Sequence, residues 1–225
     1  MAKNTTTKSD APQAVPIEAP VIIKAPTMGE GRFRIIGTAP YVQNAFPAKA
    51  REMMKAKQMA GSQAKKGAKR DPKDFELCYQ QAQHISREGW GGIPAPGFRA
   101  GLISACRLVD FKMTRAKLSL FVVADGFDRL DGTPLVRITK GKPHYVEHAV
   151  RNDSGVADIR PRPMWDEGWE AEVKLTWDAD QFSTIDVANL LMRVGLQVGV
   201  GEGRPDSKNS SGMGWGTFIL GRKEA

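Results

Sequence analysis

The spacing of apolar side chains along the chain predicts several strands. Residues 169–177 give the clearest one, because every second side chain is apolar and those between are charged or hydroxylated. Such alternation is typical of a strand with one buried and one solvated face. Residues 117–124 are apolar on both faces, which predicts a strand in the centre of a sheet. Further strands are predicted at 32–38, 134–139, 145–150 and 215–220.

Helical spacing is clearest at residues 183–194, which carry an apolar stripe. Ser183 is placed to cap the start of this helix, with Asp186 as the second member of a capping box. Gly195 is placed to end the helix. A glycine-rich loop between residues 199 and 216 then leads into the last strand.

Three more helices are predicted earlier in the chain. One follows a turn rich in glycine and proline, and its apolar face begins at Phe98 and extends to Val109. Arg99 lies in the first turn of this helix, where the helix dipole attracts anions. The other two are predicted at 48–59 and 74–87.

The order of these elements is strand, helix, strand, additional strands, strand, helix, strand. It predicts an α+β fold with a ferredoxin-like (RRM-like) βαββαβ core, in which two helices cover one face of an antiparallel sheet. Residues 29–225 form this domain, and residues 41–92 are a basic helical insertion after the first strand. Residues 1–28 are rich in proline, alanine and threonine, which predicts a flexible arm or, as the alternative, an arm packed on a neighbouring subunit.

The net charge of the chain indicates the class of partner that it binds. The 225 residues have a formal net charge of +8 and a pI of about 9.6, which favours nucleic acid first and an anionic membrane second. Bases are densest at 48–70, where Glu52 is the one acid. Most charge runs are simply solvated, but this one would also attract phosphates in a way that weakens as salt rises.

The glycine-rich loop indicates a polyanion rather than a nucleotide cofactor. A dinucleotide-binding loop follows a strand and opens a helix, whereas this loop follows a helix and opens a strand. Glycines let a backbone approach an extended polyanion closely. Tyr41, Phe46 and Trp90 are candidates for stacking on bases, although each is more often a core residue.

Other functions find little support in the sequence. The chain has two cysteines without a CxxC pair and three histidines, which do not indicate a zinc site. The low number of cysteines fits a reducing cytoplasm, that of a bacterial or phage-infected cell. No metalloprotease, nucleophile-elbow or P-loop motif occurs, so we expect no enzyme activity and no cofactor. Asp125, Asp128 and Asp131 form an acidic turn that holds a cation or, as we favour, caps backbone groups. No apolar run is long enough for a membrane helix.

Two short motifs resemble a known family. Residues 93–102 read IPAPGFRAGL, which is similar to the IPGSSLRGAL turn-into-helix of the RAMP superfamily, the RNA-binding backbone subunits of CRISPR effector complexes. The last helix and the glycine-rich segment 199–218 resemble the glycine-rich loop and final strand of that superfamily. The resemblance covers these motifs and the order of elements, and suggests a diverged relative carried by a phage or another mobile element.

The resemblance implies copies that stack along a single strand, with the basic insertion as a thumb. Our hypothesis is therefore a non-catalytic protein that binds single-stranded RNA or DNA without sequence preference and forms a homo-oligomer or filament, with no membrane partner. The alternatives are a structural or scaffold protein of a phage-like assembly and a metal-dependent RNase. Arg151, Arg160 and Arg162 form a basic patch only if the fold brings them together. The candidate nucleic-acid-binding residues are Asn44, Phe46, Lys49, Arg51, Lys55, Lys65, Lys66, Lys69, Arg70, Arg99, Arg107, Arg204 and Lys208.

Overall fold

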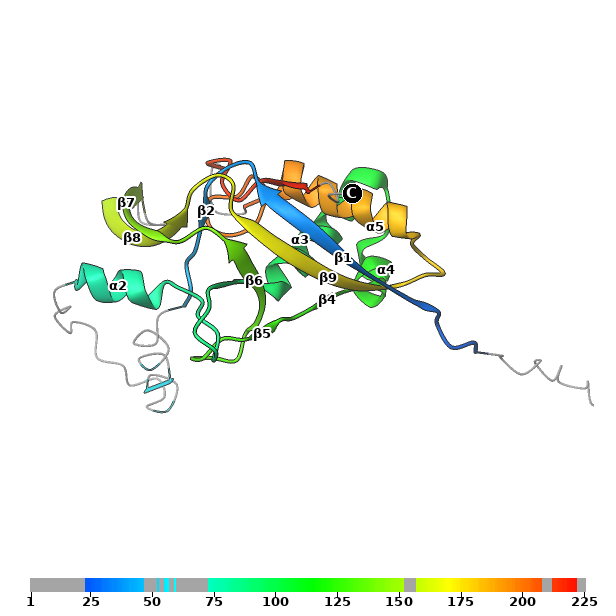
Figure 1. Cartoon of the computed structure of the whole chain (residues 1–225), viewed down its shortest axis with the longest axis horizontal. Helices are drawn as coiled ribbons and strands as arrows, with labels where there is room; N and C mark the ends of the chain where they lie inside the picture. The colour runs from blue at the N-terminus through cyan, green and yellow to red at the C-terminus, as the bar shows by residue number, and fades with distance from the viewer. Residues whose placement is uncertain are drawn as a thin grey trace, which may run out of the picture.

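Two antiparallel sheets and a layer of helices make up an α+β fold (Figure 1). The structure is a computed structural model that describes residues 23–46, 52, 55–56, 59, 73–151, 157–207 and 212–221. Within these residues, the larger sheet has the strand order β10-β1-β9-β6-β3, with β4 also paired to β9 and β5 to β6. The smaller sheet has the order β2-β8-β7.

The centre of the larger sheet is the antiparallel pair of β1 (Met28–Gly37) and β9 (Glu170–Asp178). Their pairing runs from Met28 opposite Asp178 to Ile36 opposite Glu170. The strand predicted at 32–38 is confirmed, and it begins four residues earlier than predicted. The strand β10 borders β1, while β4 and β6 share the other side of β9. The remaining strands of this sheet are β3 (Gly92–Pro94), β4 (Leu120–Val123), β5 (Gly126–Phe127), β6 (Pro134–Lys140) and β10 (Phe218–Leu220).

The hydrophobic core lies between this sheet and two helices, α3 (Ala95–Ala105) and α5 (Thr184–Arg193). The alternation predicted for 169–177 is confirmed, because the four apolar side chains of β9 from Ala171 to Trp177 are all buried. Phe98 of α3 and Leu191 of α5 are fully buried against them. Burial of each such large side chain stabilises the fold by about 1.5–3 kcal/mol.

The opposite face of the sheet carries charges that are already paired. Glu170 accepts hydrogen bonds from Arg34 at 2.8 Å and from Lys140 at 3.2 Å, and the bond from Arg34 chiefly lowers the pKa of this carboxyl. Lys174 Nζ lies 2.6 Å from Asp125 Oδ1. Since acids neutralise these cations, this face of the sheet is a poor platform for a polyanion.

The smaller sheet contains a strand that the sequence did not predict. The strand β7 (His144–Arg151) confirms the prediction at 145–150, but it pairs with β8 (Ala157–Trp165), which includes Pro161 and Pro163. Prolines normally indicate a break. Here Pro163 O accepts from Gln43 N at 3.1 Å, so the backbone polar groups of residue 163 point away from β7. The N–H that proline lacks would therefore not have bonded to β7, and the hydrogen bonds between β7 and β8 stay intact.

The third strand of the smaller sheet, β2 (Tyr41–Val42), pairs with the end of β8. The helix α2 (Phe75–Gln81) packs against β8 and is capped by Asp74. It is shorter than the helix predicted at 74–87. The helix predicted at 48–59 lies mostly outside the described residues; its four described members, Glu52, Lys55, Ala56 and Met59, are helical and exposed.

The strand predicted at 117–124 is confirmed for residues 120–123, but its predicted start and its central place are wrong. The helix α4 (Met113–Ser119) extends through the first three of these residues, and β4 begins only at Leu120. Leu118 is 79% exposed on that helix. Among the described strands, β4 pairs with β9 alone, which makes it an edge strand. Short apolar runs fit a helix end and a strand equally well, and only the tertiary packing decides between them.

The capping box at the start of α5 is confirmed, and the α-helix ends at Arg193, one residue before the predicted end, but Gly195 does not stop the helical path. Ser183 N donates to Asp186 Oδ2 at 2.9 Å, and Asp186 N donates to Ser183 Oγ at 3.2 Å. After Arg193 the chain continues through a π-helical turn, Val194–Val198, and leaves it at Gly199, where φ is 71°. None of the helices in the described part is long and apolar enough to cross a membrane.

Candidate nucleic-acid interface

A groove of about 690 Å³ opens where three distant parts of the chain meet. One wall is formed by described residues of the glycine-rich loop after α5, within 200–207 and 213–215. The second is the β7–β8 ribbon, and the third is the turn that leads into α3. The glycine-rich loop and the turn into α3 are the two motifs that carried the family resemblance, and the fold brings them together.

The floor of the groove is a buried polar network. Gln43 Nε2 donates to Gly92 O at 2.6 Å and to the Tyr41 hydroxyl at 3.2 Å, and Gln43 Oε1 accepts from His84 N at 2.9 Å. Burial raises the pKa of Tyr41, so its hydroxyl stays protonated. Each polar atom of the Gln43 side chain is satisfied, which favours a rigid floor.

The N-terminus of α3 borders the groove through Pro94 and Gly97. The N-cap residue is Pro94, and no side chain caps the first turn. A Cβ built on Gly97 would meet no atom within 4 Å, so this glycine leaves open space at the helix start. Uncapped N–H groups and the positive end of the helix dipole both favour an anion at this place.

Two arginines of β8 converge on the groove. Arg160 and Arg162 are two residues apart and therefore project from the same face of the strand. Both line the groove, together with Arg204 of the glycine-rich loop. The side chain of Arg151, the third arginine of the patch considered from the sequence, is not among the described ones.

Each of these arginines has a partner within the protein. The Nε of Arg162 donates to Glu202, a half-buried acid of the glycine-rich loop. Arg160 Nε lies 3.1 Å from Asp158 Oδ2, and Arg204 Nη1 donates to Gly201 O at 3.1 Å. The cationic side chains are therefore held in place and have further N–H groups with which to bind a ligand.

The glycines of the loop allow the loop to pack closely on neighbouring rings, and they do not leave its backbone open to a ligand. A Cβ on Gly201 would lie 2.6 Å from the Tyr41 ring, and one on Gly203 would lie 2.4 Å from Trp215. Both residues have positive φ. The loop can thus fold tightly over these rings and present Glu202 and Arg204 at the groove wall, while Gly97 rather than these glycines supplies bare backbone.

Two histidines line the groove in settings that the sequence did not reveal. His84 Nδ1 lies 2.9 Å from Asp128 Oδ2, and both side chains are largely buried. The His148 ring packs on Trp215 with centroids 4.6 Å apart, and its Nε2 is buried with no hydrogen-bond partner in the described part of the chain. Burial chiefly lowers the pKa of His148, so that His148 and Trp215 present neutral rings at neutral pH.

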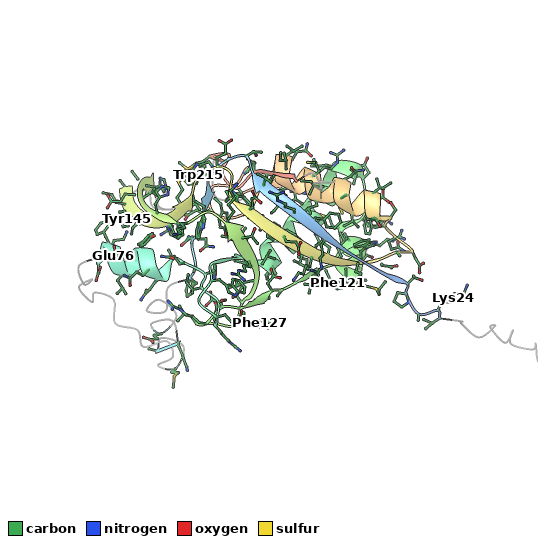
Figure 2. The ribbon with its side chains drawn as sticks, viewed as in Figure 1. Lys24, Glu76, Phe121, Phe127, Tyr145 and Trp215 are labelled. Atoms are coloured by element: carbon green, nitrogen blue, oxygen red, sulfur yellow. The ribbon has the colours of Figure 1, made fainter. Side chains whose placement is uncertain are left out.

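None of the aromatic candidates from the sequence presents an exposed ring in the groove. Tyr41 is buried in the floor, and the Trp90 ring packs under Arg137 outside the groove. Phe46 is exposed but does not line the groove. Trp215, which Figure 2 shows toward the β7–β8 end of the molecule, is an aromatic side chain of the groove wall, although its sequence context predicts only the start of a strand.

Of the candidate binding residues that are described, Asn44 and Arg204 line the groove. Arg99 instead donates from Nε to Leu120 O at 3.0 Å and also binds Lys117 O, which holds the end of α4. Arg107 is paired with Asp206 at 2.8 Å outside the groove. The candidates outside the described residues are Lys49, Arg51, Lys65, Lys66, Lys69, Arg70 and Lys208.

The acidic turn caps backbone groups, as favoured from the sequence. Asp125 accepts from Arg137 N, Asp128 from Leu130 N, and Asp131 from Thr133 N, each at 2.8 to 2.9 Å. In the ranges that the structure describes, no group of three or more His, Cys, Asp or Glu is arranged to hold a metal ion.

Comparison with models of known protein families found no match, and comparison with curated proteins found none.

Proposed function

We propose that this protein binds single-stranded nucleic acid, without sequence preference, in the groove between the glycine-rich loop, the β7–β8 ribbon and the start of α3. The observation that carries the proposal is the convergence of Arg160, Arg162 and Arg204 on the uncapped N-terminus of α3. Guanidinium groups and free backbone N–H groups are donors suited to phosphate oxygens. The ring of Trp215 beside them is suited to stacking on a base.

The lack of sequence preference follows from the chemistry of the groove. Its charged donors match the phosphates that every nucleotide carries, and these contacts do not read the base. A stacking ring accepts any base, because each has a π face. The same chemistry accepts RNA and DNA, and we assign no catalytic step and no cofactor to the site.

The arrangement of the larger sheet supports a ferredoxin-like core. The neighbouring strands β10, β1, β9 and β4 are all antiparallel. The helix α3 lies between β1 and β4 in the chain, and α5 lies between β9 and β10. This is the connectivity of a βαββαβ unit. Together with the two motifs at the groove, it supports our proposal that the chain is a diverged relative of the RAMP superfamily.

The insertion at 41–92 borders the groove in its described parts. Asn44 and His84 line the groove, and α2 packs on β8 behind the arginines. The lysines and arginines of 48–70 lie between β2 and α2 in the chain. We propose that they contact the strand beyond the groove, as the thumb of the resemblance would, and that copies line up along it.

A direct test is fluorescence anisotropy with labelled oligo(dT) and oligo(U) of about 30 nucleotides. We expect both to bind with similar affinity, and the logarithm of the association constant to fall linearly with the logarithm of salt between about 50 and 200 mM. A duplex of the same length should bind more weakly. Absence of binding at the lowest salt, after removal of co-purified nucleic acid, would contradict the proposal.

Glu202 provides a second test, because its carboxylate occupies the Arg162 guanidinium that a phosphate would contact. Replacing Glu202 by Gln should raise the affinity for oligo(dT) by about 3- to 10-fold at low salt, since one competing charge is removed. Glu172→Gln, on the far face of the sheet, is the matched control with the same change of charge. Equal increases in the two variants would point to net charge alone.

A further inference from the structure

An apolar hollow of about 780 Å³, which shares no lining residue with the groove, lies between α5 and the segment that leads into α4. Its floor contains the packed rings of Phe111 and Phe182, whose centroids are 4.7 Å apart, and the side chain of Leu190. Its rim contains Val109 and Leu196, which are 44% and 57% exposed. Large apolar side chains that stay exposed around a hollow indicate a surface that another chain covers.

The N-terminal arm emerges beside this hollow. Thr27 O accepts from Ala179 N at 2.7 Å, and Gln181, two residues further on, lines the hollow. The described root of the arm, residues 23–27, leads away from the body of the molecule, and Ile23 is 88% exposed (Figure 1). Lys24 lies at the end of the long axis away from Trp215 and the groove (Figure 2).

The chemistry of the arm matches the hollow. Residues 11–22 read APQAVPIEAPVI, with prolines at 12, 16 and 20 and Glu18 as the single charged residue. Proline-rich segments favour the extended polyproline II conformation and dock into grooves lined by aromatic rings, at a low entropic cost. Arg193 lines the hollow and would offer a positive charge to Glu18 of a docked arm, while Asp186 is already bound to Ser183.

We propose that the hollow is the docking site for the N-terminal arm of a neighbouring copy. At about 3.1 Å per residue the 22 residues before Ile23 span up to about 70 Å, several times the length of α5. Because the described root points outward, the arm reaches a second copy more directly than its own hollow. A contact between two different surfaces is heterologous, so it joins copies into a closed ring or an open chain. Docking of the arm does not require bound nucleic acid, so an experiment can contradict it without contradicting the proposed function.

Sedimentation velocity of the full chain, freed of nucleic acid, tests the inference. We expect self-association that rises with concentration. Leu196→Glu in the hollow, and a full-length variant with Val15, Ile17 and Val21 changed to Glu in the arm, should each weaken it by at least about tenfold, because a charge enters an apolar contact. Ile185→Glu is the matched control: Ile185 is on α5, just before the turn that carries Leu196, and is 72% exposed, but it does not line the hollow.

Disulfide trapping identifies the copy that supplies the arm. In a Cys78→Ser background, one tagged protein carries Ile17→Cys and a second, of different size, carries Asn189→Cys at the hollow. We expect a disulfide-linked heterodimer on mixing. The inference is overturned if the wild type is a monomer at all concentrations, if the arm variant self-associates like the wild type, or if a double-cysteine chain links only within itself. In every variant, the affinity for an oligonucleotide short enough to bind one copy should stay unchanged. An unchanged affinity shows that the variant is folded and that its loss of self-association does not arise from a change in the groove.

Discussion

Replacing Arg160, Arg162 and Arg204 together by Gln is expected to lower the affinity for oligo(dT) by about 100-fold at low salt, if each phosphate contact contributes about 1 kcal/mol. The three guanidinium groups converge on one groove, so their removal takes away its cationic wall. The slope of the logarithm of affinity against the logarithm of salt should also fall by about 2, since each phosphate contact on a single strand releases about 0.7 counterion. Fluorescence anisotropy across a salt series measures both quantities.

The control must carry the same loss of charge away from the groove. Arg32, Arg87 and Arg129 are exposed and do not line it, so their replacement by Gln serves this purpose. Because Arg162→Gln would leave Glu202 without its partner, the experiment is repeated with Glu202→Gln in the background. Comparable losses in the groove variant and the control would show that net charge, rather than the groove, binds the strand.

Gly195→Ala is expected to lower the free energy of unfolding by about 3 kcal/mol or more. A Cβ at this position would lie 2.0 Å from the carbonyl oxygen of Phe218 and 2.7 Å from its ring. The first neighbour is backbone of β10, so it cannot move aside without shifting the edge of the sheet. Urea denaturation followed by circular dichroism measures the change.

Gly97→Ala is the matched control, because a Cβ there meets no atom within 4 Å and the residue is helical. It should leave stability unchanged or raise it by up to about 1 kcal/mol, since alanine favours a helix over glycine. If Gly195→Ala unfolds at the same urea concentration as the wild type, the close approach of the π-helical turn to β10 does not constrain the fold as inferred.

The elements that sequence analysis identified best are those governed by local rules. The alternation in β9 and the capping box of Ser183 and Asp186 depend on neighbours within a few residues, and both are confirmed. The strand β8 was missed because Pro161 and Pro163 normally break strands, and their tolerance here depends on which neighbour each backbone group faces. The helical end of 117–124 was missed because apolar runs of that length fit either structure.

The residues of the candidate site also fall into two groups, those with a local sequence signal and those without one. The turn before Phe98 and the glycine-rich loop were recognisable as motifs, and both lie at the groove. Arg99 was selected for its place in a helix, whereas its guanidinium binds the carbonyl groups at the end of α4. His84 and Trp215 carried no local signal, because their partners Asp128 and His148 are distant in the sequence.

Three features depend only on residue type and on contacts within a few positions, so the sequence alone was enough to establish them. They are the apolar and polar faces of the strands and helices, the start of α5, and the cationic character of the whole chain. The tertiary structure decided which cations share a surface and which are already paired. It also decided that Gly195 serves a close approach to Phe218 rather than a helix end, and that Gly97 leaves a helix N-terminus open. Most of these features join segments that are far apart in the sequence, and no local pattern of side chains encodes which distant segments meet.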